Sequence, residues 1–583
     1  MKLARAFLIG ALLAAGMGPV AARNPDPANS AGGQIAPDPA MATVSGIVSR
    51  DPGGELMKKV LVELIAESQA TGGNHTALTG ADRAFHMENI APGRYRLFAE
   101  HTGFLEVDKH RPRADGHLLT LRAGQELKDV LIRLQAAAVV EGRVTDEDGD
   151  PLAEAQVAVL RQTLASGHRH WEQAGGERTN DLGEYRIANL PAGSYYISVT
   201  PPLDFKALIE TTNVSASDSR EASTGSPEKP VPTSYKTTYY PGTGERAQAA
   251  PIDLHAGVDF PANFSLTPSP SIVIRGSITY LAPGASALVL LQSKDVNSTR
   301  AAEVKKDGRF EVRDVSPGTY TLMATVTDAN GSKLARQPVQ VASANLEGIR
   351  LTPQAGARVH GYLRVQSKSN FGRLMPAGFF LSLVPADGED DVSSAMPIGE
   401  GFAPVAHVND DATFEWKDVP AGHYYIQLLG AESVSPDCFL KSVIAGGRDV
   451  TDSGFSVNGG SVLADLVASA DGAVTEGLVA NAKGEAMANA VVVAAPEPSL
   501  RSRPDRFYKT VSDQSGHFFL HGVPPGAYTL ISWESVDGDA YYDPEFLSKY
   551  EGQGRTLHLN ESEHANMQLV VVPSAEEPPA DQP

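Results

Sequence analysis

The sequence predicts an all-β protein, a tandem array of about five small antiparallel β-sandwich domains. Three observations lead to this prediction. An aromatic residue, a glycine and a tyrosine recur at one fixed spacing, a glycine recurs in a strand-like apolar pattern upstream of each set, and a short apolar strand closes each repeat. Self-similarity of this kind is typical of repeat architectures, and short strands separated by turn residues are typical of sandwiches.

The aromatic pattern is the most regular of the three. In each copy the glycine follows the aromatic residue by eight positions and the tyrosine follows it by ten, with an aliphatic residue and a turn between them. Chance does not keep this spacing five times, so one small unit is repeated along the chain. The five sets are Phe85, Gly93, Tyr95; Tyr185, Gly193, Tyr195; Phe310, Gly318, Tyr320; Phe414, Gly422, Tyr424; and Phe518, Gly526, Tyr528.

Each aromatic set is interpreted as a β-hairpin. Around the aromatic residue, as in residues 183–187, large apolar residues alternate with mostly polar ones, which is the period of a half-buried strand. The turn that follows is rich in proline, which fixes φ, and glycine, which can take a positive φ. A second strand begins at each tyrosine, and the pattern predicts that it pairs with the strand before the turn.

A second signature opens each unit, a strand of the form apolar, x, Gly, x, apolar. In the fifth copy threonine takes the first apolar place. A glycine inside a strand usually marks a bulge or a close approach of another backbone. The glycines are Gly46, Gly142, Gly276, Gly361 and Gly477, and the closing apolar strands lie at residues 130–134, 262–266, 346–351, 462–467 and 567–571.

These patterns set the expected domain boundaries. The sandwiches are expected at residues 41–136, 137–268, 269–354, 355–470 and 471–572, with a long excursion from the second at about residues 201–250. About 100 residues per domain falls in the usual range. Residues 23–40 and 573–583 are rich in proline with small or acidic residues, so they are expected to be a disordered linker and a disordered tail.

The N-terminus predicts export. Lys2 and Arg5 precede a short apolar stretch, and Val20, Ala21 and Ala22 offer the small residues of a cleavage site, so residues 1–22 are expected to be a signal peptide. A membrane anchor fits poorly because a spanning helix needs about 20 apolar residues. The expected location is therefore the periplasm, the outer membrane or the extracellular space. No transmembrane anchor is expected in the mature chain.

Composition limits the partners. The 583-residue chain has a formal net charge of −21, which disfavours binding to nucleic acid or to anionic lipid surfaces. Cys438 is the single cysteine, so no intrachain disulfide can form, and it is expected to be a small core residue. Stability must therefore come from packing within each sandwich.

Four segments carry a resemblance to a known family. Residues 140–146 (Val-Glu-Gly-Arg-Val-Thr-Asp), 149–155, 180–185 and 190–195 together resemble the carboxypeptidase regulatory-like domain. That family is a transthyretin-like β-sandwich, grouped with the Cna B-type and carbohydrate-binding-like folds. The second and fifth units match best, and the resemblance extends over most of residues 41–574. It implies a fold and an extracytoplasmic setting in a multi-repeat exported bacterial protein, and it implies no reaction.

Motifs for catalysis are scarce, and the protein is expected to be a non-enzyme without a cofactor. The sequence has no HExxH helix, GxSxG elbow or phosphate-binding glycine loop. Its HxxE match, His558 to Glu561, lacks a third ligand and a catalytic domain around it. In the peptidases the regulatory-like domain is an appendage to the catalytic domain, so the resemblance adds no peptidase activity.

Metal binding has two weak signals. His168 and His170 lie on one side of an extended loop, but two ligands do not make a site. Acidic clusters at residues 146–150 and 387–391 contain oxygen ligands that suit Ca²⁺, but hairpin turns use the same residue types. No metal is therefore expected.

The last unit carries the strongest binding candidate, a group of aromatic residues. Trp533 lies on the face of its strand opposite Tyr528, and Tyr541, Tyr542 and Tyr550 follow it. Aromatic faces backed by acidic residues stack on sugar rings, so these four residues are candidate carbohydrate-binding residues. The alternative is that the rings cover the hydrophobic edge of the terminal domain.

The functional hypothesis is an exported, non-enzymatic protein that acts as a binding or spacer module at the cell envelope. A polysaccharide or peptidoglycan is the first candidate ligand, on the basis of the fold group and the terminal aromatic residues. The alternative is a structural or assembly scaffold that contacts other envelope proteins. An exposed aromatic row would favour sugar binding, whereas buried rings would favour protein contact.

Overall fold

The computed structural model describes most of the chain after the N-terminal segment. The expected signal peptide, nearly all of the linker, residues 201–232 of the excursion and nearly all of the C-terminal tail lie outside the described residues. The described residues are 40–67, 73–106, 116–165, 168–200, 233–270, 272–293, 299–315, 317–328, 331–342, 344–368, 378–386, 405–431, 435–536 and 538–573.

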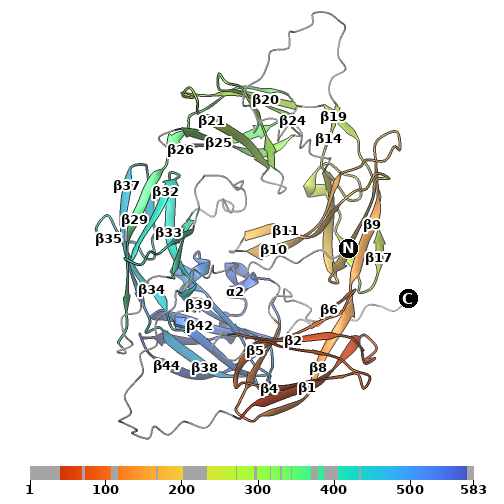
Figure 1. Ribbon diagram of the computed structural model, residues 1–583, viewed down its shortest axis with the longest axis vertical. Helices are drawn as coiled ribbons and strands as arrows, with labels where there is room; N and C mark the ends of the chain where they lie inside the picture. The colour runs from red at the N-terminus through yellow and green to blue at the C-terminus, as the bar shows by residue number, and fades with distance from the viewer. Residues whose placement is uncertain are drawn as a thin grey trace, which may run out of the picture. The chain divides into compact units, whose positions relative to one another are not determined.

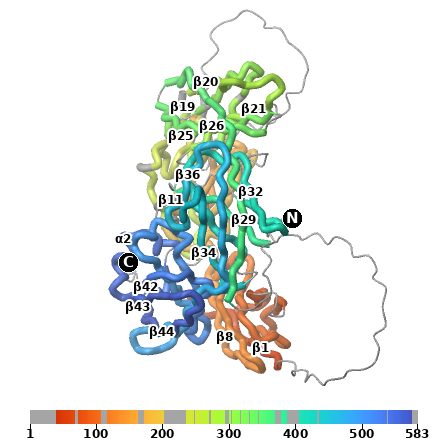
Figure 2. The backbone as a smooth tube through the Cα atoms, turned by 90° about the vertical axis from the view of Figure 1, so that its left-hand side faces the viewer, coloured from red at the N-terminus to blue at the C-terminus, as the bar shows by residue number. Residues whose placement is uncertain are grey.

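The described chain is almost entirely β-structure, as predicted (Figure 1). Five stretches of the chain each form sheets that enclose one hydrophobic core, and most strand pairs are antiparallel. Figure 2 shows the strands of the fourth sandwich, such as β29, β32 and β34, gathered in one colour range of the chain. The protein is therefore a tandem array of β-sandwiches.

The first two sandwiches are formed as follows. The first has sheets β4-β1-β8-β6 and β3-β2-β5-β7. The second has sheets β12-β9-β17 and β11-β10-β13-β15, and in addition β18 pairs with β9 and β16 pairs with β13. Strands β14 and β19 form a separate pair. Their bounds are β1 (Ala42–Asp51), β2 (Leu61–Ala66), β3 (His75–Leu78), β4 (Ala84–Ile90), β5 (Gly93–Glu100), β6 (Phe104–Glu106), β7 (His117–Leu121), β8 (Glu126–Ala136), β9 (Ala138–Thr145), β10 (Gln156–Ala165), β11 (His168–Arg178), β12 (Glu184–Leu190), β13 (Gly193–Thr200), β14 (Thr233–Tyr235), β15 (Thr238–Tyr239), η2 (Arg246–Gln248), β16 (Ile252–Leu254), β17 (Asp259–Pro261), β18 (Phe264–Ser265) and β19 (Pro268–Pro270).

The third and fourth sandwiches follow the same plan. The third has sheets β23-β24-β20-β27 and β22-β21-β25-β26-β28, and the fourth has sheets β32-β29-β37-β34-β35 and β31-β30-β33-β36. Their bounds are β20 (Ile272–Ile278), β21 (Ser286–Ser293), β22 (Thr299–Ala301), β23 (Glu303–Val304), β24 (Arg309–Val315), β25 (Gly318–Asp328), β26 (Gly331–Val341), β27 (Leu346–Leu351), β28 (Gln354–Ala355), β29 (Ala357–Gln366), β30 (Phe380–Pro385), β31 (Val405–His407), β32 (Thr413–Val419), β33 (Gly422–Leu429), β34 (Phe439–Ala445), β35 (Arg448–Asp449), β36 (Phe455–Val457) and β37 (Ser461–Ser469).

The fifth sandwich adds short helices to its two sheets, β41-β38-β44 and β40-β39-β42-β43. Its elements are β38 (Ala473–Ala480), β39 (Val491–Pro496), η4 (Pro498–Leu500), η5 (Pro504–Arg506), β40 (Tyr508–Val511), β41 (His517–Val523), β42 (Gly526–Trp533), η6 (Ala540–Tyr542), α2 (Pro544–Ser548), η7 (Glu551–Gln553), β43 (Arg555–Leu559) and β44 (His564–Val570).

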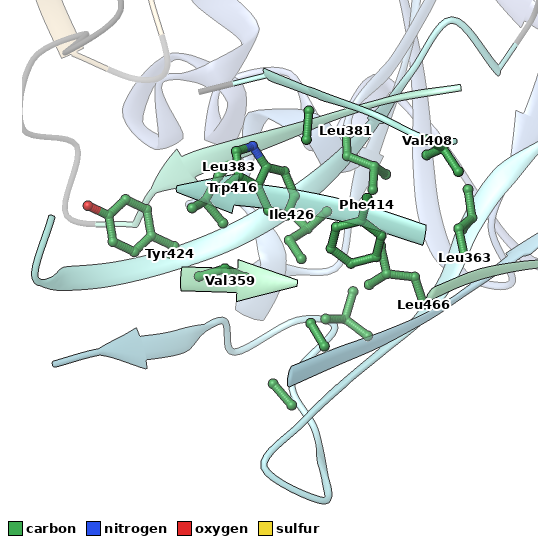
Figure 3. Packing of buried hydrophobic residues seen from close by; sticks show 14 of the residues in the cluster. Val359, Leu363, Leu381, Leu383, Val408, Phe414, Trp416, Tyr424, Ile426 and Leu466 are labelled. Carbon is green, nitrogen blue, oxygen red and sulfur yellow. The ribbon is translucent and has the colours of Figure 1, made fainter. Parts of the chain in front are cut away.

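The core of the fourth sandwich illustrates how each unit is packed. Phe414 and Trp416 come from one sheet, and Leu381 and Ile426 come from the other, and all four are buried. Figure 3 shows these side chains pointing toward one another between the strands. Trp416 therefore occupies the core face that the two-residue spacing from Phe414 predicts.

Each opening strand pairs in parallel with the closing strand of its own sandwich. The pairs are β1 with β8, β9 with β17 and β18, β20 with β27, β29 with β37, and β38 with β44. The repeated glycine sits at this pairing: a Cβ on Gly361 would lie 1.7 Å from the Ala464 carbonyl oxygen, and one on Gly477 would lie 1.8 Å from that of Met567. The same approach, at 1.9 to 2.6 Å, occurs at Gly46, Gly142 and Gly276. The glycine therefore marks a close backbone approach, which is one of the two roles that the sequence predicted.

The predicted hairpin is wrong in its pairing. β24 pairs with β20 and β23, whereas β25 pairs with β21 and β26, so the Pro-Gly turn carries the chain from one sheet to the other. The same holds in the other four units. The turn residues predict a reversal of the chain, but they do not determine whether the next strand joins the same sheet or the facing one. The aromatic residue and the tyrosine consequently face the core from opposite sheets.

The tyrosine after each turn folds back over the turn. In the first, second, fourth and fifth sandwiches its hydroxyl donates to the carbonyl oxygen four residues earlier, as from Tyr95 to Ala91 at 2.8 Å and from Tyr424 to Pro420 at 3.0 Å. The bonds from Tyr195 to Pro191 and from Tyr528 to Pro524 repeat this geometry. A Cβ on Gly422 would lie 3.0 Å from the ring of Tyr424, so the glycine leaves room for the ring. The arrangement is comparable to the tyrosine corner of immunoglobulin domains.

Between the aromatic residue and the turn, the residue just before the repeated aliphatic residue forms a bulge. The sequence interpretation missed this bulge. Asn89, Asn189, Asp418 and Gly522 have φ between 56° and 66°, and the pairing with the opening strand shifts register beside each of them. Asn, Asp and Gly are the residues that tolerate this left-handed conformation. After the bulge the aliphatic residue pairs once more with the opening strand, as Leu190 does with Ala138, and the chain then crosses to the second sheet.

Substituting the repeated glycine should destabilise its sandwich. In Gly477→Ala the new methyl group would meet the Met567 carbonyl at 1.8 Å, so β38 and β44 must move apart, at a cost of at least about 2 kcal/mol. Faster hydrogen exchange in β38 and β44 measures this loss. Gly552→Ala is the matched control, because no atom lies within 4 Å of its new Cβ. Equal protection in the two variants would contradict the close-approach explanation.

Removing the tyrosine hydroxyl should have a smaller effect. Tyr424→Phe leaves the Pro420 carbonyl without its 3.0 Å hydrogen bond, which should cost the fourth sandwich about 1 kcal/mol. The measurement is the free energy of opening of β32 and β33, from hydrogen exchange across a urea series. Tyr362→Phe in the same sandwich is the control, because Tyr362 is half exposed on the outer face. A loss as large in the control as in Tyr424→Phe would refute the role of this bond.

Candidate functional site

The outer face of the fifth sandwich carries the aromatic residues that the sequence singled out. Trp533 lies with Ile531 on the face of β42 opposite Tyr528 and Leu530, and these two pairs belong to separate hydrophobic clusters. The segment of η6, α2 and η7 packs over Trp533, and Figure 1 shows α2 beside β39 and β42. We call residues 540–553 the aromatic cover.

The rings of the aromatic cover pack on one another. The ring centroid of Trp533 lies 6.2 Å from that of Phe546 and 5.9 Å from that of Tyr550, and those of Tyr541 and Tyr542 are 4.6 Å apart. Trp533 and Tyr541 are only 2% and 1% exposed, while Tyr542 and Tyr550 are half-buried. The four candidate residues therefore share one cluster, in which Tyr542 and Tyr550 are the less buried members. Sugar stacking at these residues stays a prediction.

Two phenols of the aromatic cover, those of Tyr541 and Tyr542, have a raised pKa. Burial raises the pKa of Tyr541 far above its ordinary value, and the neighbouring Tyr542 and Asp539 raise it further. The Tyr541 hydroxyl donates to Asp539 Oδ1 at 2.5 Å. Burial, followed by the charge of Asp539, raises the pKa of Tyr542 to about 12. Burial therefore favours the neutral, hydrogen-bond-donating form of both phenols.

Beside the aromatic cover, the same sheet face has an open depression of about 440 Å³. Its floor is the cross-strand pair Thr529 and Thr556, and its walls include Arg501 and His558. Arg501 is held in place, because its Nε donates to the Pro496 carbonyl at 3.1 Å and its guanidinium pairs with Glu551 of the cover. The sequence interpretation missed this depression, although the alternation that placed Trp533 on the outer face also places Thr529 there.

The junction between the fourth and fifth sandwiches is built around a buried arginine. Arg503, 6% exposed, forms a two-point ion pair with Asp505 at 2.8 and 2.7 Å. Its Nη1 also donates to the carbonyl oxygens of Thr451 and Asp452, at 3.1 and 2.9 Å, across the junction. The guanidinium carbon lies 3.8 Å from the ring centroid of Tyr425. Planar donors and a stacked ring fix orientation as well as distance.

A second part of this junction is formed by Glu561. Lys441 Nζ contacts its two carboxylate oxygens at 2.9 and 2.8 Å, and Ser469 Oγ donates to it at 2.6 Å. Burial raises the pKa of Glu561, but the bonds from Lys441 and Ser469 and the charge of Lys441 outweigh it, so the pKa lies below the ordinary 4.5. Nearby, the Asp437 carboxylate contacts His521 Nδ1 at 2.9 Å. The connecting chain between β37 and β38 is only residues 470–472.

The first and fifth sandwiches also contact each other. The side-chain amide of Gln514 accepts from Thr120 N at 2.9 Å and donates to Thr120 O at 2.8 Å. Asn489 Nδ2 lies 2.9 Å from His117 Nδ1. Because β7 is the edge strand of its sheet, Gln514 satisfies backbone groups that an edge otherwise leaves open.

The metal candidates are either engaged elsewhere or undescribed. Asp146 Oδ1 accepts from the backbone N–H groups of Asp148 and Asp150, at 3.0 and 2.8 Å, so it stabilises a turn. The side chains of His168 and His170 and the acidic residues 387–391 lie outside the described residues. Across the described ranges, no three His, Cys, Asp or Glu side chains gather as metal ligands.

Two other sequence features have clear positions. In the HxxE match, His558 lines the depression whereas Glu561 belongs to the junction, so the two do not converge. Cys438 is buried in the fourth core, as expected.

Within the part of the chain that the structure describes, no helix has the length and apolar character to cross a membrane.

Comparisons with known proteins agree with the β-sandwich fold. Residues 139–222 match the model of the carboxypeptidase regulatory-like domain, which is the family that the second unit resembles. No curated protein matches the sequence.

The solved structures that match this chain include two pilin proteins. The Bacillus anthracis TIE protein is 10% identical, with 74% of each chain covered and a TM-score of 0.15. GBS52, the minor pilin of Streptococcus agalactiae, is 12% identical over 40% of this chain and 97% of its own, with a TM-score of 0.20. BcpA, the major pilin subunit of Bacillus cereus, is 10% identical over 73% and 99%, with a TM-score of 0.14.

The contact between Glu561 and Lys441 predicts that the stability of the protein depends on pH. The folded-state pKa of Glu561 is depressed, so its stabilisation is complete above the unfolded pKa of about 4.5 and is lost as the pH falls through the lower folded value. The difference in melting temperature between wild type and Glu561→Gln should therefore be largest near neutral pH and shrink below about pH 4.5. Glu88→Gln, at an exposed position of β4, is the control. A difference that stays constant down to pH 3 would exclude this mechanism.

Proposed function

We propose that this protein is an exported, non-enzymatic scaffold of the cell envelope whose β-sandwiches are held in fixed relation by junction contacts. The observation that carries the proposal is the buried Arg503, which joins the fourth and fifth sandwiches. The periplasm, the outer membrane and the extracellular space are the settings that the N-terminal signal pattern supports.

The energetics of Arg503 favour a specific junction. A buried guanidinium is costly unless its donors are satisfied, and here Asp505 and two carbonyl oxygens accept from it. If the fourth sandwich moved away, the N–H groups of Arg503 that now donate to Thr451 and Asp452 would lose their acceptors together. Arg506 supports the same contact, because its Nη2 donates to Asp452 Oδ1 at 2.6 Å and to the Thr451 carbonyl at 3.1 Å. Two adjacent arginines that hold one loop resist rotation better than a single point charge.

The connection between these sandwiches adds to this restraint. Gly472 packs so closely that a Cβ there would lie 2.6 Å from the Asp437 carbonyl oxygen and 2.7 Å from Gly522 Cα. The Asp471 carboxylate accepts from Lys368 N at 2.6 Å. A short connection whose backbone is packed on both sides leaves little freedom to hinge. These features suit a protein that sets distances between other envelope components.

A non-catalytic role is supported by what the candidate polar residues do. Asp146 stabilises a turn, Glu561 forms an ion pair, and Asp505 neutralises a buried arginine. Catalysis needs polar groups that converge on one cleft, and these groups are dispersed in separate structural contacts. Contacts with other envelope proteins are the expected partner interactions of such a scaffold, with polysaccharide or peptidoglycan binding as the second candidate function.

Replacing Arg503 tests the proposal. Arg503→Ala should raise hydrogen exchange in β34 and in residues 449–454 of the fourth sandwich, although the substitution is in the fifth. Losing a buried ion pair and its two carbonyl bonds should cost about 3–5 kcal/mol of junction stability. Arg555→Ala, at an exposed position of β43, is the control and should leave the fourth sandwich unchanged. Faster exchange confined to the fifth sandwich would contradict a rigid junction.

A further inference from the structure

The geometry points to a binding site for a neutral saccharide in the depression beside the aromatic cover, distinct from the four aromatic residues themselves. The site lies on the outer face of β42 and β43 and is walled by Glu497, Pro498 and Arg501. Its volume of about 440 Å³ falls in the range of small-molecule sites and fits one or two sugar rings. This inference rests on the second candidate function, polysaccharide binding, and does not depend on the junction.

The lining has the donor and acceptor balance that sugars require. Arg501 supplies only donors, Glu497 supplies only acceptors, and the hydroxyls of Thr529 and Thr556 supply both. A sugar hydroxyl donates and accepts at once, so mixed groups around one depression satisfy it better than a single charge type does. Pro498 adds apolar surface for the C–H face of a ring.

The charges favour a neutral ligand over an acidic one. Arg501 is paired with Glu551, and Glu497 adds a further negative charge at the rim. The formal charge of Arg501, Glu551 and Glu497 together is therefore negative, and the chain as a whole carries −21. An acidic sugar would meet repulsion both at the site and during approach. Neutral hexoses and N-acetylhexosamines are the ligand class that remains.

The site is preorganised by the elements around it. The two threonines sit on paired strands of the sheet, opposite each other at Thr529 and Thr556. Gly554 lets the start of β43 pack close to the floor, since a Cβ there would lie 2.6 Å from Thr529 Cγ2. Arg501 is only 15% exposed and is fixed at both ends of its guanidinium by Pro496 and Glu551. Fixed donors reduce the conformational entropy that ligand binding would cost.

The test is a titration of the purified full chain with defined trisaccharides. The probes are chitotriose, cellotriose, maltotriose and mannotriose, with trigalacturonate as the acidic comparison, and binding is measured by calorimetry and by saturation-transfer NMR. At least one neutral probe should bind. Arg501→Ala should weaken binding about tenfold, because hydrogen bonds to charged groups are the strong ones. Thr556→Val should also weaken it, and it leaves the Arg501 pairing intact.

The control separates this site from other surfaces. Thr319→Val changes an exposed strand threonine of the third sandwich and should bind as wild type does. Trp533→Phe, beneath the aromatic cover, tests the separate prediction of sugar stacking. Absence of binding by every neutral probe, preference for trigalacturonate, or binding that neither Arg501→Ala nor Thr556→Val weakens would each overturn the proposal. None of these outcomes bears on the Arg503 junction, which is tested by hydrogen exchange.

Discussion

In every sandwich the closing strand passes so near the opening strand that a carbonyl oxygen occupies the space where a side chain would begin. Gly361 and Ala464 show the closest approach, with 1.7 Å between a built Cβ and the oxygen. Because the two strands are parallel, the chain leaves each sandwich at the end opposite its entry. The connection to the next opening strand is short. One residue separates β8 from β9, and three residues separate β37 from β38. The short connections, and hence the tight junctions, depend on this pairing.

Much of this fold could be predicted from residue spacing, and the main failure has a clear physical cause. The repeated glycine indicated a close backbone approach, which the parallel closing strand confirms. The turn between Phe310 and Tyr320 was expected to close a hairpin, but it crosses between sheets. The cue lay in the residue before the aliphatic position, such as Asn189 with φ of 62°, which forms a bulge near the end of the first strand.

The candidate site could be predicted only in part. Strand alternation placed Trp533 outside the main core of the fifth sandwich, and its separate cluster agrees with that placement. What buries its ring is the segment at residues 540–553, and no local pattern specifies where such a segment packs. The Arg503 junction was equally hidden, because its partners Thr451 and Asp452 lie some fifty positions earlier. Contacts of this kind require the tertiary structure.

A distance distribution between two spin labels shows whether neighbouring sandwiches keep a fixed relation. Spin labels at Leu463 of the fourth sandwich and Val570 of the fifth would occupy positions that are 51% and 55% exposed, in a background where buried Cys438 is replaced by serine. Double electron–electron resonance should give one narrow distance distribution. A broad distribution, or several separate distances, would mean that the two sandwiches move independently and would contradict the scaffold account.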